Sequence, residues 1–354
     1  MRVIHVASGR EWRGGQRQTY YLARALANAP GIESLVVTRT DSQLHHALAS
    51  EGVQCVAVPW TIGLDPRALV ALFREVKAGD VVHAHDSHAH AMVDVIARVR
   101  PVTVIATRRV NLPIRTPTRW RRAAATIALS QPIRARLLNA GVAKHRVSII
   151  PPAIEFPPVD AEWPQVLSPL TPGLQLVISI AALTPEKGVD ILLDAASLLR
   201  VRFPNLRVVV FGDGPERRAL SAHHERLGLG PMFTLVGQQP TPEALLRHAA
   251  IYVQPSRSEG FGSSVLDAMA RGVPVVATDT GGLPEALAGG GGQIVPAENA
   301  AAMAAAVAMM LNNPAARQQI GAAGRIAAQG FGIERLVART MDVYRSAVME
   351  TIDR

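Results

Sequence analysis

Two carboxylates and one lysine carry the clearest chemistry in this sequence. Glu259 and Asp267 are eight residues apart with a Gly-Phe-Gly turn between them, and Lys187 lies upstream in a Pro-Glu-Lys-Gly segment. Carboxylates hold hydroxyl groups, and a lysine beside them offers a positive charge for an anion. A glycine turn flanked by two acids is unusual for a packed core, so these residues are candidates for a binding site.

The elements around the two acids can be predicted from the local pattern. An apolar run at 251–255 predicts a strand, and a helix is expected to begin near Ser263 and to stop at Gly272. Glu259 would then lie on the loop, and Asp267 about a turn into the helix. The helix N-terminus between them has free backbone N–H groups, which suit a phosphate. A diphosphate, a lysine and two carboxylates for hydroxyl groups together predict a nucleotide-sugar pocket.

Bulk properties indicate a globular protein with two domains. The chain has 354 residues, of which 48% are hydrophobic and 18% are charged. The longest purely apolar run, 300–311, is too short to span a bilayer, and the N-terminus enters a strand without an apolar signal region. Cys55 is the single cysteine, which excludes an intrachain disulfide and fits a reducing compartment. We expect a cytoplasmic location.

Short apolar runs alternate with helical stretches, and the pattern occurs twice, which is typical of doubly wound parallel sheets. The expected strands are 3–7, 34–38, 55–58, 81–84, 102–107 and 126–129, then 176–181, 207–211, 233–236, 251–254, 273–278 and 292–295. Helices are expected at 16–28, 66–76, 132–139, 189–199 and 334–353. Prolines 157, 158, 164, 169 and 172 indicate a stiff linker.

We therefore expect an α/β protein of two Rossmann-like domains that face each other across a cleft. The expected domains are residues 1–165 and 166–333, with a closing helix at 334–354 that crosses back to the first domain. Ligands of such sheets bind at the carboxyl ends of the strands. The polar candidates follow expected strands: Lys187, the segment 212–215, Glu259, the segment 13–15 and His85.

The positive charge is concentrated in the first half of the chain. Residues 1–150 hold 21 Lys+Arg against 9 Asp+Glu, a net +12, whereas the rest of the chain is at −3. Ten arginines and no acid lie between Arg98 and Arg136. Such a patch attracts a polyanion, for which we expect an anionic membrane surface or a phosphorylated acceptor. A solvated, arginine-rich surface is the plainer interpretation. Nucleic acid is not expected, because only Trp120 interleaves with the arginines.

Several motifs together resemble the retaining glycosyltransferases of family 4, which have the GT-B fold. In the second half these are Pro185-Glu-Lys-Gly188, Gly212-Asp-Gly-Pro215, Pro255-Ser-Arg-Ser-Glu-Gly-Phe-Gly262, the segment 268–276 and Gly281-Gly282. In the first half they are Gly14-Gly15, His83-Ala-His-Asp86 and the segment 148–152. The resemblance covers nearly the whole chain, and the combination is specific although each motif alone is weak.

The resemblance implies metal-independent hexosyl transfer from a nucleotide-diphosphate sugar, with UDP or GDP as the expected nucleotide and no cofactor. It implies catalytic roles for His85, Lys187 and Glu259: His85 positions the donor sugar, Lys187 binds the diphosphate and Glu259 holds a sugar hydroxyl. The implied donor-binding residues are Gly14, Gly15, Gly212, Gly214, Phe261, Gly262, Ser263, Ser264, Val265 and Asp267. For the acceptor, a glycan or glycolipid of the cell envelope such as lipopolysaccharide, we expect a patch formed by Arg108, Arg109, Arg115, Arg119, Arg121 and Arg122. The protein would then be peripheral at the inner face of the cell membrane.

Two departures from the family leave alternatives open. Ala182 stands where the family has an arginine five residues before the lysine, and Asp267 stands where it has a glutamate. Arg13 or Arg257 is a candidate replacement for the missing cation. A non-catalytic sugar-nucleotide binding protein is therefore one alternative, and a nucleic-acid-binding protein that uses the arginine run is another. A nucleotide-sugar epimerase or a phosphorylase would share the fold but fits the Glu259–Asp267 segment less well.

The histidines at 83, 85, 88 and 90 raise the question of a metal site. His83 and His85 alternate on a strand end and so face the same side, which would suit zinc. No cysteine is near, and Asp86 is the only adjacent carboxylate. We therefore predict no metal, a positioning role for His85 and a structural role for His5.

Overall fold

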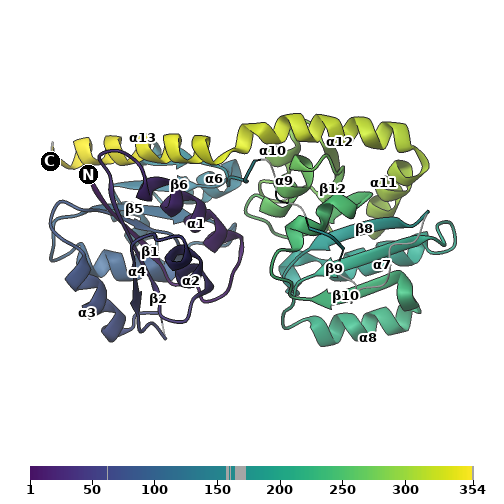
Figure 1. The fold of residues 1–354 in the computed structure, drawn as a ribbon, viewed down its shortest axis with the longest axis horizontal. Helices are drawn as coiled ribbons and strands as arrows, with labels where there is room; N and C mark the ends of the chain where they lie inside the picture. Colours follow the sequence, from purple (N-terminus) through teal and green to yellow (C-terminus); the bar gives the residue numbers. More distant parts are fainter. Residues whose placement is uncertain (62, 157–158, 160, 164–172, 353–354) are drawn as a thin grey trace. The chain divides into compact units, whose positions relative to one another are not determined.

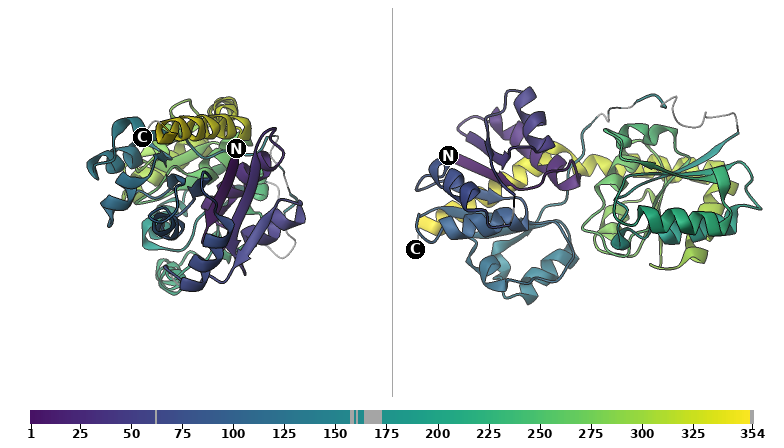
Figure 2. Two further views of the ribbon diagram at one scale, coloured as in Figure 1. Left: turned by 90° about the vertical axis from the view of Figure 1, so that its left-hand side faces the viewer. Right: turned by 90° about the horizontal axis from the view of Figure 1, so that it is seen from below.

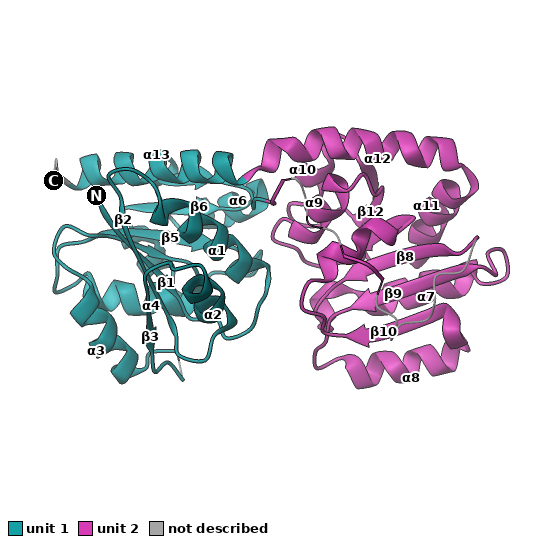
Figure 3. Cartoon of the chain, in the orientation of Figure 1, with its two compact units in different colours: residues 1–153, 333–354 teal, residues 154–332 magenta. Residues whose placement is uncertain are grey.

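The computed structural model describes the chain apart from residues 62, 157–158, 160, 164–172 and 353–354. It divides into two compact units, one of Met1–Ala153 with Ile333–Arg354 and the other of Ile154–Gly332 (Figure 3). The boundaries expected from the sequence lie at 165/166 and 333/334, twelve residues and one residue later. All five prolines of the expected linker lie outside the described residues.

The first unit is built on seven parallel strands in the order β3-β2-β1-β4-β5-β6-β7 (Figure 1). The strands are β1 (Arg2–Ala7), β2 (Glu33–Arg39), β3 (Cys55–Val58), β4 (Val81–Ala84), β5 (Thr103–Arg108), β6 (Ala125–Ala128) and β7 (Val147–Ile149). The helices are α1 (Gly14–Ala27), α2 (Gln43–Ser50), α3 (Pro66–Glu75), α4 (Ser87–Ile96), α5 (Pro117–Arg122), α6 (Gln131–Asn139) and α13 (Ile333–Ile352).

Alternation along these strands divides the core of the first unit between the two sheet faces. Ile4 and Val82 pack with residues of α4 and α6 on one face. Val3 and Val81 pack on the other, together with residues of α1 and with Tyr344 of α13. Both faces are therefore covered by helices, which explains why the strands are apolar without interruption. The closing helix lies along the face that α1 also covers (Figures 1 and 2).

The strand order of the first unit reverses at β1, which pairs with β2 on one side and β4 on the other. Helices that follow β1 and β4 thus leave the sheet in opposite directions, and a crevice at the carboxyl ends of these strands is the usual ligand position of this topology. The register pairs His5 of β1 with His83 of β4. The residues that follow β1 and β4, among them the predicted site residues Gly14, Gly15 and His85, therefore lie at this position.

The second unit has six parallel strands in the order β10-β9-β8-β11-β12-β13. They are β8 (Gln175–Ile180), β9 (Leu206–Phe211), β10 (Phe233–Gly237), β11 (Ile251–Gln254), β12 (Val275–Thr278) and β13 (Gly292–Val295). The helices are α7 (Val189–Leu199), α8 (Arg217–Leu227), α9 (Ser263–Ala270), α10 (Leu283–Leu287), α11 (Ala300–Asn312) and α12 (Pro314–Ala328), and a 3₁₀ turn, η2 (Pro185–Lys187), precedes α7. This order is that of a Rossmann fold and confirms the predicted parallel sheets.

The core of the second unit contains aliphatic residues of its strands packed with α7 and α11. The alanine-rich run at 300–311 is accordingly a core helix. Across the described residues, none of the helices combines the length and apolar character needed to cross a bilayer.

Candidate functional site

The loop after β11 enters α9 at Gly262, whose φ of 92° lies in the left-handed region. A Cβ at this position would lie 2.6 Å from Leu283 Cδ2, so the turn requires glycine. No side chain caps α9, and its first turn has no acidic residue. The N–H of Val265 donates to the Gly262 carbonyl at 3.0 Å, whereas within the described chain the N–H groups of Ser263 and Ser264 have no backbone acceptor. The helix therefore offers an anion the amides of Ser263 and Ser264, whereas the N–H of Val265, an implied donor-binding residue, is bonded within the first turn.

Lys187 and Glu259 come from two different loops and form an ion pair at the same end of the sheet. Lys187 Nζ lies 2.7 Å from Glu259 Oε2, and both side chains are only partly exposed. The same carboxylate oxygen lies 3.3 Å from Ser256 Oγ and 3.4 Å from Gln254 Nε2. The other oxygen accepts from the N–H of Gly260 at 3.0 Å. Glu259 is thus held by the end of β11, its own loop and Lys187, and it does not cap α9.

Gly281 explains why the Glu259 loop has its position. A Cβ on Gly281 would lie 1.8 Å from the carbonyl oxygen of Glu259, and its φ is 56°. Gly281 is a close-packing position that supports the acidic loop.

Gly212 and Gly214 also act through close packing. A Cβ on Gly212 would lie 2.0 Å from the carbonyl oxygen of Ala181, and one on Gly214 would lie 2.4 Å from that of Leu183. The N–H of Leu183 donates to the Asp213 carbonyl at 3.0 Å. The two predicted donor-binding glycines thus hold the loop after β8 in place.

Asp267 is a buried carboxylate, only 5% exposed, and not an ordinary surface ion-pair residue. It lies near Tyr252, whose pKa is raised mainly by burial and further by the charges of Glu259 and Asp267, while a hydrogen bond from Ser264 opposes the shift. Phe261 is 2% exposed and packs against the ring of Phe331 at 5.7 Å between centroids. Phe261 therefore stabilises the turn from within the core.

Ala182 stands where the family has an arginine, and neither Arg13 nor Arg257 directly replaces that cation. Arg257 binds both oxygens of Asp190 at 2.8 and 2.6 Å, and Arg13 pairs with Glu11 at 2.5 Å. Both guanidinium groups are therefore neutralised by carboxylates within their own unit.

In the first unit, Asp86 connects the ends of β1 and β4. Its carboxylate accepts from the N–H and the hydroxyl of Ser8 at 2.7 and 2.6 Å. It also caps α4 by accepting from the N–H groups of His88 and Ala89. These bonds give Asp86 a structural role beside His85.

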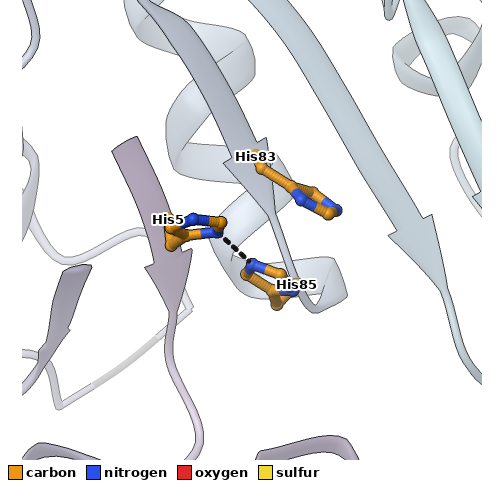
Figure 4. Close-up of side chains that lie close together, drawn as sticks. All are labelled: His5, His83 and His85. Atoms are coloured by element: carbon orange, nitrogen blue, oxygen red, sulfur yellow. Dashed lines mark hydrogen bonds between the residues drawn. The ribbon is translucent and has the colours of Figure 1, made fainter. Parts of the chain in front are cut away.

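Three histidines are buried at the carboxyl ends of β1 and β4 (Figure 4). His5 Nδ1 and His85 Nε2 lie 3.0 Å apart, and the rings of His83 and His85 have centroids 4.0 Å apart. His83 is bonded through Nδ1 to the Tyr344 hydroxyl at 2.6 Å and through Nε2 to Thr107 at 2.7 Å. The sequence correctly placed His83 and His85 on one side, but the contact with α13 could not be read from it.

The tautomer of His85 follows from its neighbours. Arg109 Nη2 lies 3.1 Å from His85 Nδ1, and because a guanidinium only donates, Nδ1 is the acceptor. His85 Nε2–H then donates to His5. Both ring nitrogens of His85 are thus engaged, and neither is presented to a sugar in this arrangement. The expected direct role of His85 stays a prediction that would require these bonds to change.

Burial keeps the three imidazoles neutral. It lowers the pKa of His5 to about 4 and holds the pKa values of His83 and His85 well below their usual range. One ring nitrogen from each lies within 4.8 Å of the others, a spacing that would allow a metal ion. However, both nitrogens of His83 and of His85 already have hydrogen-bond partners, and Arg109 would repel a divalent cation. These residues fit a hydrogen-bonded cluster better than a metal centre.

The six arginines of the predicted patch do not form one exposed surface in the structure, because some are buried or paired and others are exposed. Arg108 is 6% exposed and donates to the Leu112 carbonyl, so it does not belong to a surface patch, and Arg109 lies against His85. Arg122 binds both oxygens of Asp94 at 2.9 and 2.6 Å.

The segment from Arg98 to Arg136 contains no acidic residue, but Asp94, which lies just before it, pairs with two of its arginines. Asp94 also accepts from Arg98 at 3.1 Å, and the spacing of four residues from Asp94 to Arg98 was the signal that could have revealed this. Arg115 and Arg121 remain exposed, and Arg119 is half-buried and donates to the Ser87 carbonyl.

Comparisons with protein families agree with this geometry. Residues 168–327 match the model of the glycosyl transferases group 1, and residues 12–156 match that of glycosyltransferase family 4. The chain belongs to glycosyltransferase family 4, a retaining family with the GT-B fold.

Curated relatives match parts of the chain. The D-inositol 3-phosphate glycosyltransferase of Paenarthrobacter aurescens is 29% identical over 237 residues, 64% of this chain and 58% of the relative. That of Segniliparus rotundus is 35% identical over 153 residues, 40% of this chain and 34% of the relative. The lipopolysaccharide core biosynthesis mannosyltransferase LpsB of Rhizobium meliloti is 34% identical over 139 residues, 38% of this chain and 40% of the relative. The chain thus aligns with between about a third and three fifths of these relatives' lengths.

Solved structures show the same fold over the whole chain. HepE of Anabaena in complex with UDP-glucose has a TM-score of 0.84 at 18% identity and covers 98% of this chain and 100% of its own. The lipopolysaccharide outer core galactosyltransferase WaaB has a TM-score of 0.73 at 14% identity, with 98% and 99% covered.

Proposed function

We propose that this chain transfers a hexosyl group from a UDP-sugar to a lipid-linked or phosphorylated glycan of the cell envelope, with retention at the anomeric carbon. The observation that carries the proposal is the Lys187–Glu259 pair, 2.7 Å apart, together with the uncapped N-terminus of α9 in the same unit. This combination offers a cation, two amides and a carboxylate, which are the groups that a sugar diphosphate needs. The HepE complex with UDP-glucose supports the choice of donor, because it shares the fold.

The reaction breaks the bond between the anomeric carbon and the diphosphate oxygen and forms a bond from that carbon to an acceptor hydroxyl. Lys187 and the amides of Ser263 and Ser264 stabilise the negative charge that develops on the leaving diphosphate. The departing phosphate oxygen takes the proton of the acceptor hydroxyl, so no side chain has to act as a covalent nucleophile. Because these groups neutralise the leaving charge, the step needs no divalent cation.

Glu259 and Asp267 orient the donor. Glu259 binds a hydroxyl of the donor sugar, for which its fixed loop provides a preorganised acceptor. Asp267, on the second turn of α9, binds the ribose.

The acceptor assignment relies on charge and on relatives. The first half of the chain has a net charge of +12, and Arg115 and Arg121 are exposed. One relative is named a lipopolysaccharide core biosynthesis mannosyltransferase and others are named D-inositol 3-phosphate glycosyltransferases, and these names are compatible with a phosphorylated acceptor. We place the protein at the inner face of the membrane, held reversibly by these arginines.

A non-catalytic sugar-nucleotide binding protein is the second candidate, and Ala182 is the observation that favours it. A nucleic-acid-binding function has lost support, because Trp120, the one aromatic side chain within the arginine run, is buried in the core and cannot stack on a base.

Turnover of nucleotide sugars separates these candidates. Purified protein is incubated with UDP-, GDP- and ADP-glucose, and release of the nucleoside diphosphate is measured beside thermal stabilisation by each nucleotide. We expect UDP-glucose to give both stabilisation and slow hydrolysis. Stabilisation without turnover, in the presence of lipid-linked and phosphorylated acceptors, would favour the binding protein, and no response to any nucleotide would refute both.

A further inference from the structure

The two oxygens of the Glu259 carboxylate have different numbers of hydrogen-bond donors around them. Three donors surround Oε2: Lys187 Nζ at 2.7 Å, Ser256 Oγ at 3.3 Å and Gln254 Nε2 at 3.4 Å. Among the described residues, Oε1 accepts only from the N–H of Gly260, at 3.0 Å. Because a carboxylate oxygen has about two acceptor sites, Oε2 is saturated, whereas Oε1 can accept one more donor.

Two of the donors on Oε2 belong to buried, uncharged side chains at the end of β11. Gln254 and Ser256 are each no more than 2% exposed. Gln254 Nε2 donates to Ser256 Oγ at 2.8 Å, and the Ser256 hydroxyl donates onward to the carboxylate. The Ser256 carbonyl in turn accepts from the hydroxyl of Thr278, on β12, at 2.6 Å. The sheet therefore fixes these two donors, which stay on Oε2 when the ammonium of Lys187 turns toward a diphosphate.

Tyr252 sets the direction of the Gln254 amide. The two residues are two positions apart on β11, so their side chains lie on the same face of the sheet. The Tyr252 hydroxyl donates to Gln254 Oε1 at 2.6 Å. Because a carboxylate only accepts, the NH₂ end of the amide faces Glu259 and its oxygen faces the phenol. Burial raises the pKa of Tyr252, so the phenol keeps its proton, and Ser264 at the start of α9 gives it a further hydrogen bond.

Packing alone does not require this polar pair. The strand β11 lies inside a parallel sheet, between β8 and β12, and such strands are usually apolar. A buried amide is costly unless its polar atoms have partners, and an apolar pair of the same shape would avoid that cost. The carboxylate that they reach therefore explains Tyr252 and Gln254 better than the core that they occupy.

We propose that Gln254 and Tyr252 are positioning residues, which hold Oε2 of Glu259 and leave Oε1 to accept a hydrogen bond from a hydroxyl of the donor sugar. This inference rests on the proposed function and names the oxygen that binds the sugar. In that function, Lys187 and the α9 amides bind the diphosphate. Loss of the Gln254 amide should therefore affect a donor that carries a sugar and spare the free nucleotide.

The experiment compares UDP-glucose with UDP in the wild type, Gln254→Met, Tyr252→Phe and the control Gln293→Met. Steady-state release of UDP from UDP-glucose gives kcat and KM, and calorimetry gives the affinity for UDP. Methionine has nearly the length of glutamine without its hydrogen bonds, and Gln293 lies on β13 of the same sheet. The double variant Tyr252→Phe with Gln254→Met makes the pair apolar on both sides, and it serves if a single variant does not fold.

The Gln254→Met variant should lower kcat/KM for UDP-glucose by about ten- to a hundredfold, while the affinity for UDP stays within about twofold. Tyr252→Phe should have the same effect with a smaller factor, because it acts one bond further away. The loss from Gln254→Met should vanish in a Glu259→Ala background, since the amide acts through that carboxylate. A role in the core alone would give the same loss in both backgrounds.

Three results would overturn the inference while turnover by the wild type still supports the proposed function. They are wild-type kinetics in Gln254→Met, an equal weakening of UDP binding, and an undiminished loss in the Glu259→Ala background. A wild type that binds UDP-glucose without turnover would instead overturn the proposed transfer. The positioning role would then be decided by the affinity for UDP-glucose relative to UDP, which should fall in Gln254→Met but not in Gln293→Met. A wild type that binds neither ligand would overturn both.

Discussion

The strand-end regions of the two units use charge in opposite ways. In the second unit, Lys187 and Glu259 neutralise each other at 2.7 Å, and Arg257 is paired with Asp190. In the first unit, three buried histidines are neutral and Arg109 has no carboxylate partner among the described residues. Paired charges hold a site ready at little electrostatic cost, whereas an unpaired cation is stabilised only when an anion arrives. The second unit thus holds its charged side chains in pairs at the strand ends, whereas the first unit holds a guanidinium whose hydrogen-bond acceptors are neutral.

The largest effect is expected from breaking the pair in the second unit. Lys187→Ala and Glu259→Ala should each lower turnover of the nucleotide sugar by about a hundredfold or more, because each removes a preorganised contact to charge or to a sugar hydroxyl. Steady-state assays of nucleotide release measure the loss. Glu162→Ala breaks the exposed Glu162–Arg247 pair of the same unit and is the matched control. Near-wild-type turnover in either site variant would remove the pair from the active site.

Several elements of both units, and the residues of the Lys187–Glu259 pair, could be predicted from the sequence. The helix Val189–Leu199 and the strands Val81–Ala84 and Ile251–Gln254 begin and end at the predicted residues, because apolar runs there meet clear turn signals. The strand β7 was missed, since three residues give too short a pattern. The family motifs also brought Lys187 and Glu259 together.

Contacts between segments that are distant in the sequence could not be predicted from local patterns. The bond from His83 to Tyr344 joins residues 261 positions apart, and no local pattern encodes it. Arg109 was grouped with its neighbours in an exposed patch, because a run of arginines does not show which of them turns inward. Val265 was included among the donor-binding residues, but its N–H donates to the Gly262 carbonyl in the tight first turn of α9, and that turn depends on the left-handed conformation of Gly262.

The neutral histidines of the first unit predict a dependence of stability on pH. His5 has a pKa of about 4 when folded, against about 6.5 when unfolded. A lowered pKa means that the unfolded chain takes up protons first, so its stability contribution is complete above pH 6.5 and is lost as the pH falls toward 4. Urea unfolding at pH 7.5, 6, 5 and 4.5 should show the loss, and His5→Gln should reduce the slope. Replacing the exposed His46 in the same way should leave the slope unchanged, and equal slopes in all three proteins would contradict the assignment.

The contact of the closing helix with the histidine cluster is the next test. Tyr344→Phe removes the hydroxyl 2.6 Å from His83 Nδ1 and leaves a buried nitrogen without a partner. We expect the free energy of unfolding to fall by about 1–3 kcal/mol. Thr351→Val removes another hydroxyl from the same helix, one that bonds only to the backbone, and serves as the control. A loss no larger than that of the control would mean that the bond contributes little.

The exposed arginines should have a smaller effect. Arg115→Glu combined with Arg121→Glu should weaken binding to vesicles that contain anionic lipid by about tenfold or more at low salt, since each juxtamembrane basic residue contributes about 1 kcal/mol. Vesicle co-sedimentation measures this, and hydrolysis of the donor should be unaffected. The control reverses Arg202 and Arg218, two exposed arginines of the second unit. Equal vesicle binding by both double variants and the wild type would identify the remaining patch as a solvated surface.

The smallest effect is expected from metal removal. The histidine cluster has the spacing of a metal site, but hydrogen bonds occupy both nitrogens of His83 and of His85, and Arg109 adds a positive charge beside them. In the proposed reaction, Lys187 and the α9 amides stabilise the negative charge of the diphosphate leaving group, so that step needs no divalent cation. Turnover should therefore stay within twofold after dialysis against about 1 mM EDTA, and added zinc should not raise the melting temperature. Activity that disappears with EDTA and returns with zinc or manganese would contradict the hydrogen-bonded interpretation of the cluster. His5→Gln should then abolish the metal response, which would distinguish the cluster from a metal held elsewhere.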